Sequence, residues 1–180
     1  MKEIMMSIRV FSLVVAMLAV AMTGNAQCNN NRINIGVGAL YERGMDATLA
    51  FEHETKHHNA WEYFANGYVK WSDDPTVGHV TNKSFWRDYR TWSLGVAYKP
   101  CVTRNMNFDK NNYGSLRMGA SLGSDTHEFM GIITVGYEHN FVLRHGWRLY
   151  CGAKSDVCIN GKDLFRTGVV IGIKLPVNNN

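Results

Sequence analysis

The chain has 180 residues, of which 46% are hydrophobic and 19% are charged, and its formal net charge at pH 7 is +4. This charge is too small and too dispersed along the chain to favour direct binding of nucleic acid. The length fits one domain, and beyond the amino-terminal segment no stretch approaches the roughly 18 consecutive apolar residues of a membrane-spanning helix.

The amino-terminal segment has the pattern of a secretory signal peptide. Basic residues flank the start of an apolar run over 10–22, and small residues ending at Ala26 offer a cleavage site. The run is too short to cross a bilayer as a helix. We therefore expect residues 1–26 to be a signal peptide and residues 27–180 to form a single domain.

From residue 33 onward the chain alternates apolar residues with polar or small ones. In the first such segment Ile33, Ile35 and Val37 alternate with Asn34 and Gly36. Successive side chains of a β-strand point to opposite faces, so each segment predicts a strand with one apolar and one polar or glycine-lined face. The eight predicted strands span 33–41, 46–54, 60–71, 89–99, 113–123, 128–141, 147–156 and 164–175.

The polar face of these strands carries many charged side chains. They are Glu52, Glu62, Lys70, Arg117, Glu138, Arg148, Lys154, Arg166 and Lys174. A soluble barrel such as a lipocalin keeps its apolar face inside, where these charges would be costly unless paired. A membrane barrel turns that face to lipid instead. The sequence therefore predicts an all-β fold, an eight-stranded antiparallel up-and-down transmembrane β-barrel of outer-membrane type, with these residues as a lumen ion-pair network.

An even number of strands places both chain termini on one side of the membrane, which for outer-membrane barrels is the periplasm. The longest loop, 72–88, then lies outside, and the polar segment 100–112 is a periplasmic connection. Aromatic side chains near strand ends are expected at the headgroup level of both interfaces. The periplasmic ring consists of Phe51, Trp61, Tyr98, Phe141 and Trp147, and the outer ring of Tyr41, Trp71, Trp92, Phe129 and Phe165.

No combination of residues indicates a catalytic, cofactor or metal site. Glu138 and His139 are adjacent in a predicted strand and face opposite sides, so they cannot form the dyad that an outer-membrane lipid-modifying enzyme would need. No carboxylate or thiol ligand set completes a metal site at the turn with His53, His57 and His58. We therefore expect a protein that is not an enzyme and that needs no cofactor.

The four cysteines would enter an oxidising compartment, where they allow three full pairings. Cys151 is expected to face lipid in the middle of a strand. Cys28 and Cys101 both fall at the periplasmic end, which makes them the pair that we consider for a possible disulfide.

Five longer stretches of the chain form distinctive motifs. They are NIGVGALYERGMDATLAFEH (34–53), WEYFANGYVKW (61–71), YRTWSLGVAYKPC (89–101), GYEHNFVLRHGWRLY (136–150) and DLFRTGVVIGIKLPV (163–177). Together they resemble the TraO family of conjugative-transposon transfer proteins of Bacteroides-type bacteria, most distinctively in GYEHN and DLFRTG. The resemblance implies a part in a conjugation apparatus, a type IV secretion-like machine, and it supplies no catalytic or ligand-binding residues.

The expected barrel size narrows this implied role. An eight-stranded barrel is filled by its own side chains and cannot pass DNA or protein, so we expect an outer-membrane anchor or docking component and not a pore. Its expected partners are outer-membrane lipid and other transfer-apparatus proteins. An autonomous small surface barrel for adhesion or envelope protection stays open as the alternative. A neighbouring cluster of transfer genes would favour the first role.

Overall fold

The computed structural model describes residues 31–41, 43–55, 58–81, 84–85, 89–104, 112–125 and 127–177, so the expected signal peptide lies outside the described residues. Within these ranges, no helix is both long and apolar enough to cross a bilayer. The elements are β1 (Asn31–Leu40), β2 (Gly44–Glu54), β3 (Ala60–Lys70), β4 (Tyr89–Lys99), β5 (Cys101–Arg104), β6 (Asn112–Ser124), β7 (Phe129–Val142), the 3-10 turn η2 (Arg144–Gly146), β8 (Arg148–Ile159) and β9 (Phe165–Pro176).

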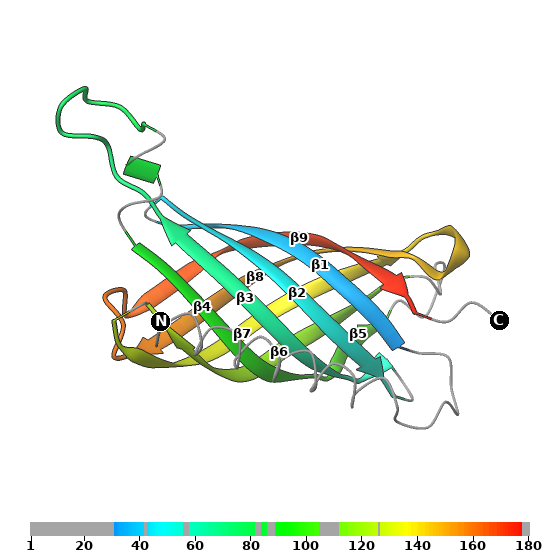
Figure 1. Ribbon diagram of the computed structural model, residues 1–180. Coiled ribbons are helices and arrows are strands. Elements are labelled where there is room, and N and C mark those ends of the chain that lie inside the picture. The colour runs from blue at the N-terminus through cyan, green and yellow to red at the C-terminus, as the bar shows by residue number, and fades with distance from the viewer. Residues whose placement is uncertain are drawn as a thin grey trace.

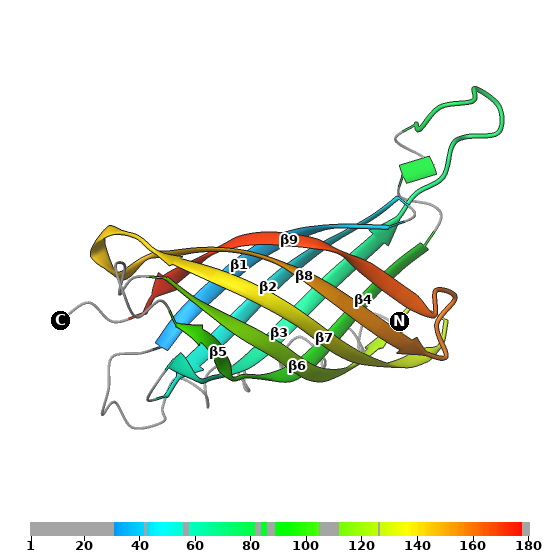
Figure 2. The ribbon, with the colours of Figure 1, turned by 180° about the vertical axis from the view of Figure 1, so that it is seen from behind.

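The strands form one closed antiparallel sheet (Figures 1 and 2). Its order is β4-β3-β2-β1-β9-β8-β7-β6-β5, and β4 also pairs with β6, which closes the sheet into a barrel. β5 follows β4 directly after Pro100 and pairs with β6, so β4 and β5 together make one stave of an eight-staved wall. The predicted all-β, eight-stranded up-and-down barrel fold is therefore confirmed.

The two ends of the barrel differ. β1 begins and β9 ends at one of them, hereafter the terminal end. The opposite end, hereafter the loop end, carries the segment 71–88, whose described part projects away from the wall in Figure 1. The carboxylate of Asp74 orders this segment, because it accepts hydrogen bonds from the backbone N–H of Thr76 at 3.0 Å and the hydroxyl of Thr81 at 3.1 Å.

Strand register determines which side chains face outward. In β1, Ile35 and Val37 are 48% and 50% exposed, whereas Asn34, which precedes them, is 2% exposed. The pattern continues around the barrel, and the exposed outward residues include Leu49, Val96, Leu122, Ile133, Val135, Val169 and Ile171. An apolar surface of this extent is rare on soluble monomers and typical of a barrel wall that meets lipid.

Glycines on the inward face make room for longer side chains. Gly36 of β1 and Gly172 of β9 are paired, and the ring of Tyr150 from β8 lies against both. A Cβ atom on Gly172 would lie 2.6 Å from the Cε1 atom of Tyr150, which is closer than carbon atoms can approach. The glycine pair therefore allows a tyrosine ring to fill part of the lumen.

Most strand boundaries differ from the sequence-based expectation by one or two residues, and two differences are larger. The sequence predicts a turn throughout 100–112, but this segment begins with β5, because the chain continues along β6 beyond Pro100. β8 extends past its expected end at residue 156 to Ile159, because Cys158 continues the inward pattern and is buried. Both differences lengthen the wall and leave its topology unchanged.

Three valines test whether the outward wall meets lipid. Val135 of β7 and Val77 of the segment 71–88 are each 52% exposed, and Val96 of β4 is 40% exposed. We expect Val96→Arg and Val135→Arg each to lower the free energy of unfolding in vesicles by about 2–4 kcal/mol, because each charge meets hydrocarbon. Val77→Arg should change it by less than about 0.5 kcal/mol. Urea titrations followed by tryptophan fluorescence measure these values, and equal effects at all three positions would contradict a lipid-facing wall.

Candidate functional site

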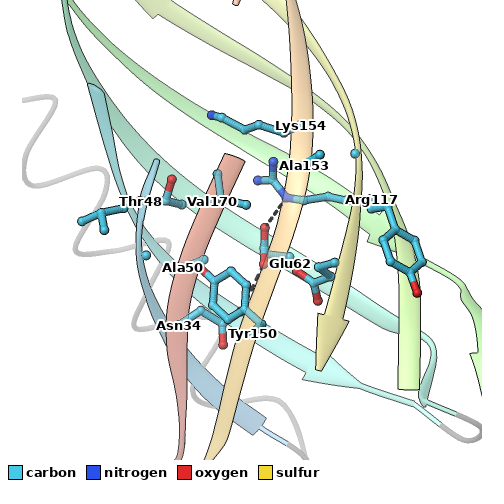
Figure 3. A pocket seen from close by; sticks show the side chains of 14 residues that line it. Asn34, Thr48, Ala50, Glu62, Arg117, Tyr150, Ala153, Lys154 and Val170 are labelled. Atoms are coloured by element: carbon cyan, nitrogen blue, oxygen red, sulfur yellow. Dashed lines mark hydrogen bonds and ion pairs between the residues drawn. The ribbon is translucent and has the colours of Figure 1, made fainter. Parts of the chain in front are cut away.

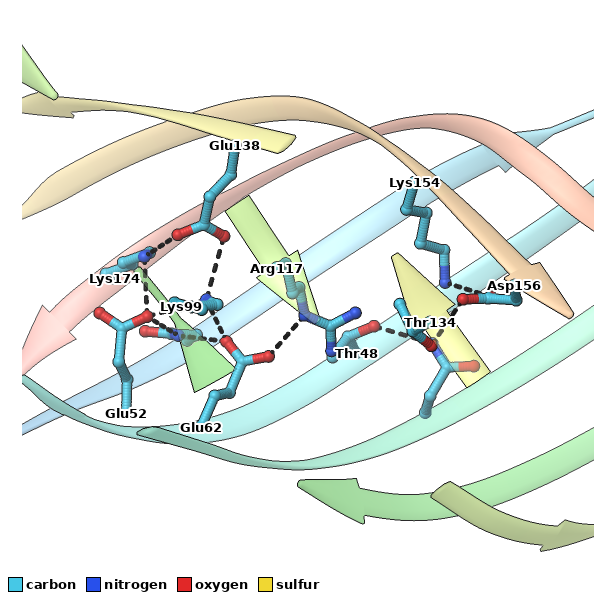
Figure 4. Close-up of polar contacts among 12 residues, drawn as sticks. Thr48, Glu52, Glu62, Lys99, Arg117, Thr134, Glu138, Lys154, Asp156 and Lys174 are labelled. Atoms are coloured by element: carbon cyan, nitrogen blue, oxygen red, sulfur yellow. Dashed lines mark hydrogen bonds and ion pairs between the residues drawn. The ribbon is translucent and has the colours of Figure 1, made fainter. Parts of the chain in front are cut away.

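The lumen contains a network of buried charged side chains, shown in Figure 4. The ammonium of Lys99, the last residue of β4, lies 2.8 Å from Glu52 Oε2 and 3.0 Å from Glu138 Oε2, and it also contacts Glu62. Lys174 of β9 lies 2.8 Å from Glu52 and 2.5 Å from Glu138. None of these side chains is more than 5% exposed. The network therefore links five strands of the wall across the lumen, namely β2, β3, β4, β7 and β9.

Arg117 of β6 completes the charge balance of this group. Its Nε atom lies 2.8 Å from Glu62 Oε1, and its guanidinium carbon lies 4.5 Å from the centre of the Phe64 ring. The amide of Asn34 donates to Glu52 and Glu62, at 3.1 Å each. Three carboxylates thus face three cations, as buried charges require, because an unpaired one would lose its hydration without compensation.

A second polar group lies closer to the loop end. Lys154 of β8 contacts Asp46 and lies 3.0 Å from Asp156 Oδ2. Asn66 donates to Asp46 Oδ2 at 2.9 Å, and the hydroxyl of Thr134 donates to Asp156 Oδ1 at 2.7 Å. Two neutral donors therefore supply the hydrogen bonds that a single lysine cannot give to two carboxylates.

A small cavity of about 30 Å³ separates the two groups (Figure 3). Its lining includes Asn34, Glu62, Arg117, Tyr150 and Lys154. One water molecule needs about 10–15 Å³ of such room, so the cavity can hold roughly two. Because the polar groups fill the lumen on both sides of it, the interior is a packed plug and not a passage for DNA or polypeptide.

Each mouth of the barrel holds a separate cluster. At the terminal end, Glu54 lies 3.1 Å from Arg32 and 2.8 Å from Arg148, and it also contacts His58, whose ring stacks on Tyr113 with the ring centres 4.4 Å apart. The guanidinium of Arg148 also contacts the Tyr113 hydroxyl. The stacked ring of His58 therefore ties the connection between β2 and β3 to β6 across the terminal mouth.

At the loop end, the guanidinium carbon of Arg166 lies 4.1 Å from the centre of the Tyr68 ring. One of its nitrogens donates to Thr91 at 3.0 Å. Asp163 accepts from Lys70 at 2.8 Å and from the Tyr68 hydroxyl at 3.1 Å. Side chains from β3, β4, β9 and the connection before β9 therefore meet in this mouth.

The nine predicted lumen residues all point inward, but they do not form one network. Glu52, Glu62, Arg117, Glu138 and Lys174 share the central group. The other four lie elsewhere: Lys154 in the second group, Arg148 at the terminal mouth, and Lys70 and Arg166 at the loop mouth.

Several lumen residues were missed by the sequence reasoning. They are Arg32, Asp46, Glu54, Lys99, Asp156 and Asp163. The signal for most of them was present, because the alternation of each strand, continued to its ends, places Arg32, Asp46, Glu54 and Lys99 on the inward face. Their inclusion corrects the excess of bases in the predicted set, since four of the six are carboxylates.

The predicted aromatic rings lie at opposite ends of the barrel. Tyr41, Phe129 and Phe165 are strongly exposed at the loop end, and Trp61 pairs with Tyr98 at the terminal end with ring centres 5.0 Å apart. Trp71 and Trp92 belong to the loop-end set, and Phe141 and Trp147 to the terminal set.

Phe51 differs from the expectation of an interfacial side chain, because it is 6% exposed. Its register places it on the outward face, directly between Ile33 of β1 and Tyr63 of β3. Directly paired side chains on one face of a sheet lie in contact. Phe51 is therefore a packed part of the wall surface, flanked by Ile33 and Tyr63.

The predicted cysteine pair and the histidine turn are only partly described. Cys28 and His57 lie outside the described residues, and Cys101 stands at the start of β5 at the terminal end. His53 Nδ1 lies 2.6 Å from Asn31 Oδ1, and His58 contacts Glu54. In the described ranges, no three or more His, Cys, Asp or Glu side chains gather as metal ligands would.

Two residues of the GYEHN motif have structural roles in the barrel. Its Glu138 points into the central network, while the hydroxyl of Tyr137 lies on the outward face, 3.2 Å from Thr103 Oγ1 of β5. A Cβ atom on Gly114 of β6 would collide with the Tyr137 ring, so the glycine lets this side chain reach β5. The motif therefore fastens β5 to β7 across β6 and helps to fill the lumen.

The closed wall, its apolar outward face and its charged, packed interior define a small β-barrel of the outer-membrane type. No protein-family model and no curated protein matches the chain. Among solved structures, the chain is similar to a major outer membrane protein from Thermus thermophilus, with a TM-score of 0.50 and 11% sequence identity over 80% of this chain and 98% of that one. At this identity the similarity concerns the fold alone.

The central network predicts a large effect for one substitution. Among the described residues, Lys99 alone contacts all three central glutamates. We expect Lys99→Met to lower the free energy of unfolding by about 3–5 kcal/mol, because it leaves buried carboxylates in excess of their cations. Lys162→Met, which removes an exposed ammonium, is the control and should cost less than about 0.5 kcal/mol. Equal urea midpoints for the two variants in vesicles would show that the network does not stabilise the barrel.

Proposed function

We propose that the protein is an outer-membrane β-barrel that serves as a structural or docking component of a conjugative transfer apparatus. The observation that carries this proposal is the plugged lumen. Buried ion pairs fill it, and the room between them fits about two water molecules. A barrel that transports nothing through its interior acts through its surfaces.

The outward face of the barrel wall supports a location in the outer membrane. Apolar side chains cover the outward face, and exposed aromatic residues such as Phe129 and Trp61 lie towards opposite ends of it. Aromatic rings of this kind favour the headgroup region, and closed barrels satisfy every backbone hydrogen bond within the hydrocarbon.

The conjugative role is supported by the resemblance of five stretches to the TraO family, most distinctively in GYEHN and DLFRTG. In the structure, Glu138 of the first motif and Asp163 and Arg166 of the second hold parts of the barrel together. Residues with this task fit a structural component better than an enzyme.

A second candidate is an autonomous surface barrel for adhesion or envelope protection. The observation in its favour is the projecting segment 71–88, where Val77 and Val80 are 52% and 39% exposed. Exposed apolar residues on an ordered loop are suited to contact with another surface. The genetic test below separates the two candidates.

The proposed orientation places the loop end outside the cell and both termini in the periplasm. Val77 and Val102 are similarly exposed, at 52% and 47%, and lie at opposite ends of the barrel. With the native cysteines replaced by alanine, Val77→Cys should react with a membrane-impermeant maleimide on intact cells. Val102→Cys should react only after the outer membrane is permeabilised. The reverse pattern would invert the orientation.

The proposed role predicts three results, for the purified protein, for deletion of its gene and for the tagged protein. Purified protein in planar bilayers should show no stable conductance, because the ion pairs close the lumen. Deletion of the gene should lower conjugation frequency while DNA processing in the donor continues, and the tagged protein should co-purify with other transfer proteins.

The conductance result and the conjugation result can fail separately. Large, steady channels would contradict the plugged lumen. Normal transfer by the deletion strain would exclude the conjugative role and favour the autonomous surface barrel.

A further inference from the structure

Three polar side chains meet on the outward face of the wall near the terminal end. The hydroxyl of Tyr137 on β7 lies 3.2 Å from Thr103 Oγ1 on β5 and 3.3 Å from Nδ1 of His139. Gly114 of β6 lies directly between Thr103 and His139 in the register, and its missing side chain leaves the room that Tyr137 occupies. A hydrogen-bonded chain therefore crosses three strands, on a face where the other residues of β7 are apolar or glycine.

The chain of hydrogen bonds ends in a donor that faces away from the protein. A phenol is a better donor than an imidazole N–H, and an imidazole nitrogen is the better acceptor, so the Tyr137 hydroxyl donates to Nδ1 of His139. A neutral imidazole with an accepting Nδ1 carries its proton on Nε2. Within the described ranges, Nδ1 is the one nitrogen of this ring that has a hydrogen-bond partner. We therefore assign the proton to Nε2, where it is available to an acceptor outside the protein.

The imidazole lies at the depth of the lipid headgroups. Its ring packs against Phe141 with the ring centres 4.8 Å apart, and Phe141 belongs to the aromatic set of the terminal end. Such rings favour the headgroup region. A polar N–H on a lipid-facing wall is costly unless it finds an acceptor. At this depth a phospholipid offers its phosphate oxygens, which accept hydrogen bonds and do not donate them.

A trough of small side chains leads from the imidazole towards the middle of the wall. Cys151 of β8 is paired directly with His139, and Ala153 and Ser155 follow on the same outward face. Their directly paired neighbours on both sides are larger, namely Val135, Tyr137 and His139 of β7 and Thr167, Val169 and Ile171 of β9. The hydroxyl of Ser155 lies 2.8 Å from that of Thr167, so an apolar chain can cover both without leaving them unpaired. The trough therefore fits an acyl chain.

We propose that this part of the wall binds one phospholipid, with a phosphate oxygen on His139 Nε2–H and an acyl chain along Cys151, Ala153 and Ser155. The site continues the lipid-facing wall, and its two parts match the two parts of the ligand. In the orientation proposed above it lies in the periplasmic leaflet. Only the choice of leaflet rests on that orientation, and the binding itself is independent of the conjugative role.

The test measures lipid binding by the full mature protein in detergent, using native mass spectrometry. The probes are dimyristoyl phosphatidylglycerol and dimyristoylglycerol, which has the same acyl chains and no phosphate. We expect the wild type to bind the phospholipid about tenfold more tightly than the diacylglycerol, because a hydrogen bond to a charged acceptor contributes at least that factor. Equal affinities of the wild type for the two lipids would overturn the proposal.

A second outward histidine at the same end provides the matched control. Nδ1 of His53 lies 2.6 Å from the carbonyl oxygen Oδ1 of Asn31, so this ring donates from Nδ1 and its Nε2 can only accept. His139→Leu should abolish the preference for the phospholipid, and His53→Leu should keep it. The same preference in both variants would overturn the proposal.

Two further variants test the two parts of the site separately. Tyr137→Phe keeps the ring over Gly114 but removes the donor to Nδ1, so it should weaken the preference for the phospholipid, and it serves if His139→Leu does not fold. An unchanged preference would overturn the role of the hydrogen-bonded chain. Ala153→Trp fills the trough and should weaken the binding of both lipids alike. Unchanged binding of both would overturn the placement of the acyl chain.

Discussion

Every charge in this lumen needs a partner on another stave, because the lumen is too narrow to hydrate it. The strand register by itself adds repulsion, because it places like charges opposite each other. Glu52 and Glu62 lie directly opposite each other on β2 and β3, and Arg148 and Lys174 do so on β8 and β9. Like charges in such positions destabilise a sheet. Lys99 and Lys174 offset the repulsion between the glutamates, because both ammonium groups contact Glu52.

This requirement links the interior to the assembly of the wall. Lys174 and Glu52 are separated by 122 residues in the chain, and Lys99 and Glu52 by 47. The Lys174–Glu52 pair spans the junction of β9 and β1, and the Lys99–Glu52 pair spans β3 between β4 and β2. The same contacts then resist opening, because separating these strands would leave a charge without its partner in a low-dielectric interior. The ion pairs that fill the lumen are therefore also contacts that stabilise the wall. A wide conduit would require their loss.

The sequence predicted the fold because its signal repeats in every strand. Alternation over whole segments gives the inward and outward faces without any knowledge of contacts. The signal weakens at strand ends, where Lys99 precedes Pro100 and Asp46 follows a turn, so these inward charges were missed. Which charges meet across the lumen depends on closure and shear, which local patterns do not contain. Phe51 shows a related limit, because alternation gives its face but not how far Ile33 and Tyr63 cover it.

The two distinctive motifs serve closure at opposite ends of the barrel. GYEHN places Glu138 in the central network and Tyr137 over β6 to hold β5, and DLFRTG places Asp163 and Arg166 in the loop mouth. Neither motif presents a nucleophile with a base, and both present groups that lock staves together. These contacts hold the strands together from inside the lumen. The connections differ between the two ends, and the described part of the longest, 71–88, stands clear of the wall at the loop end.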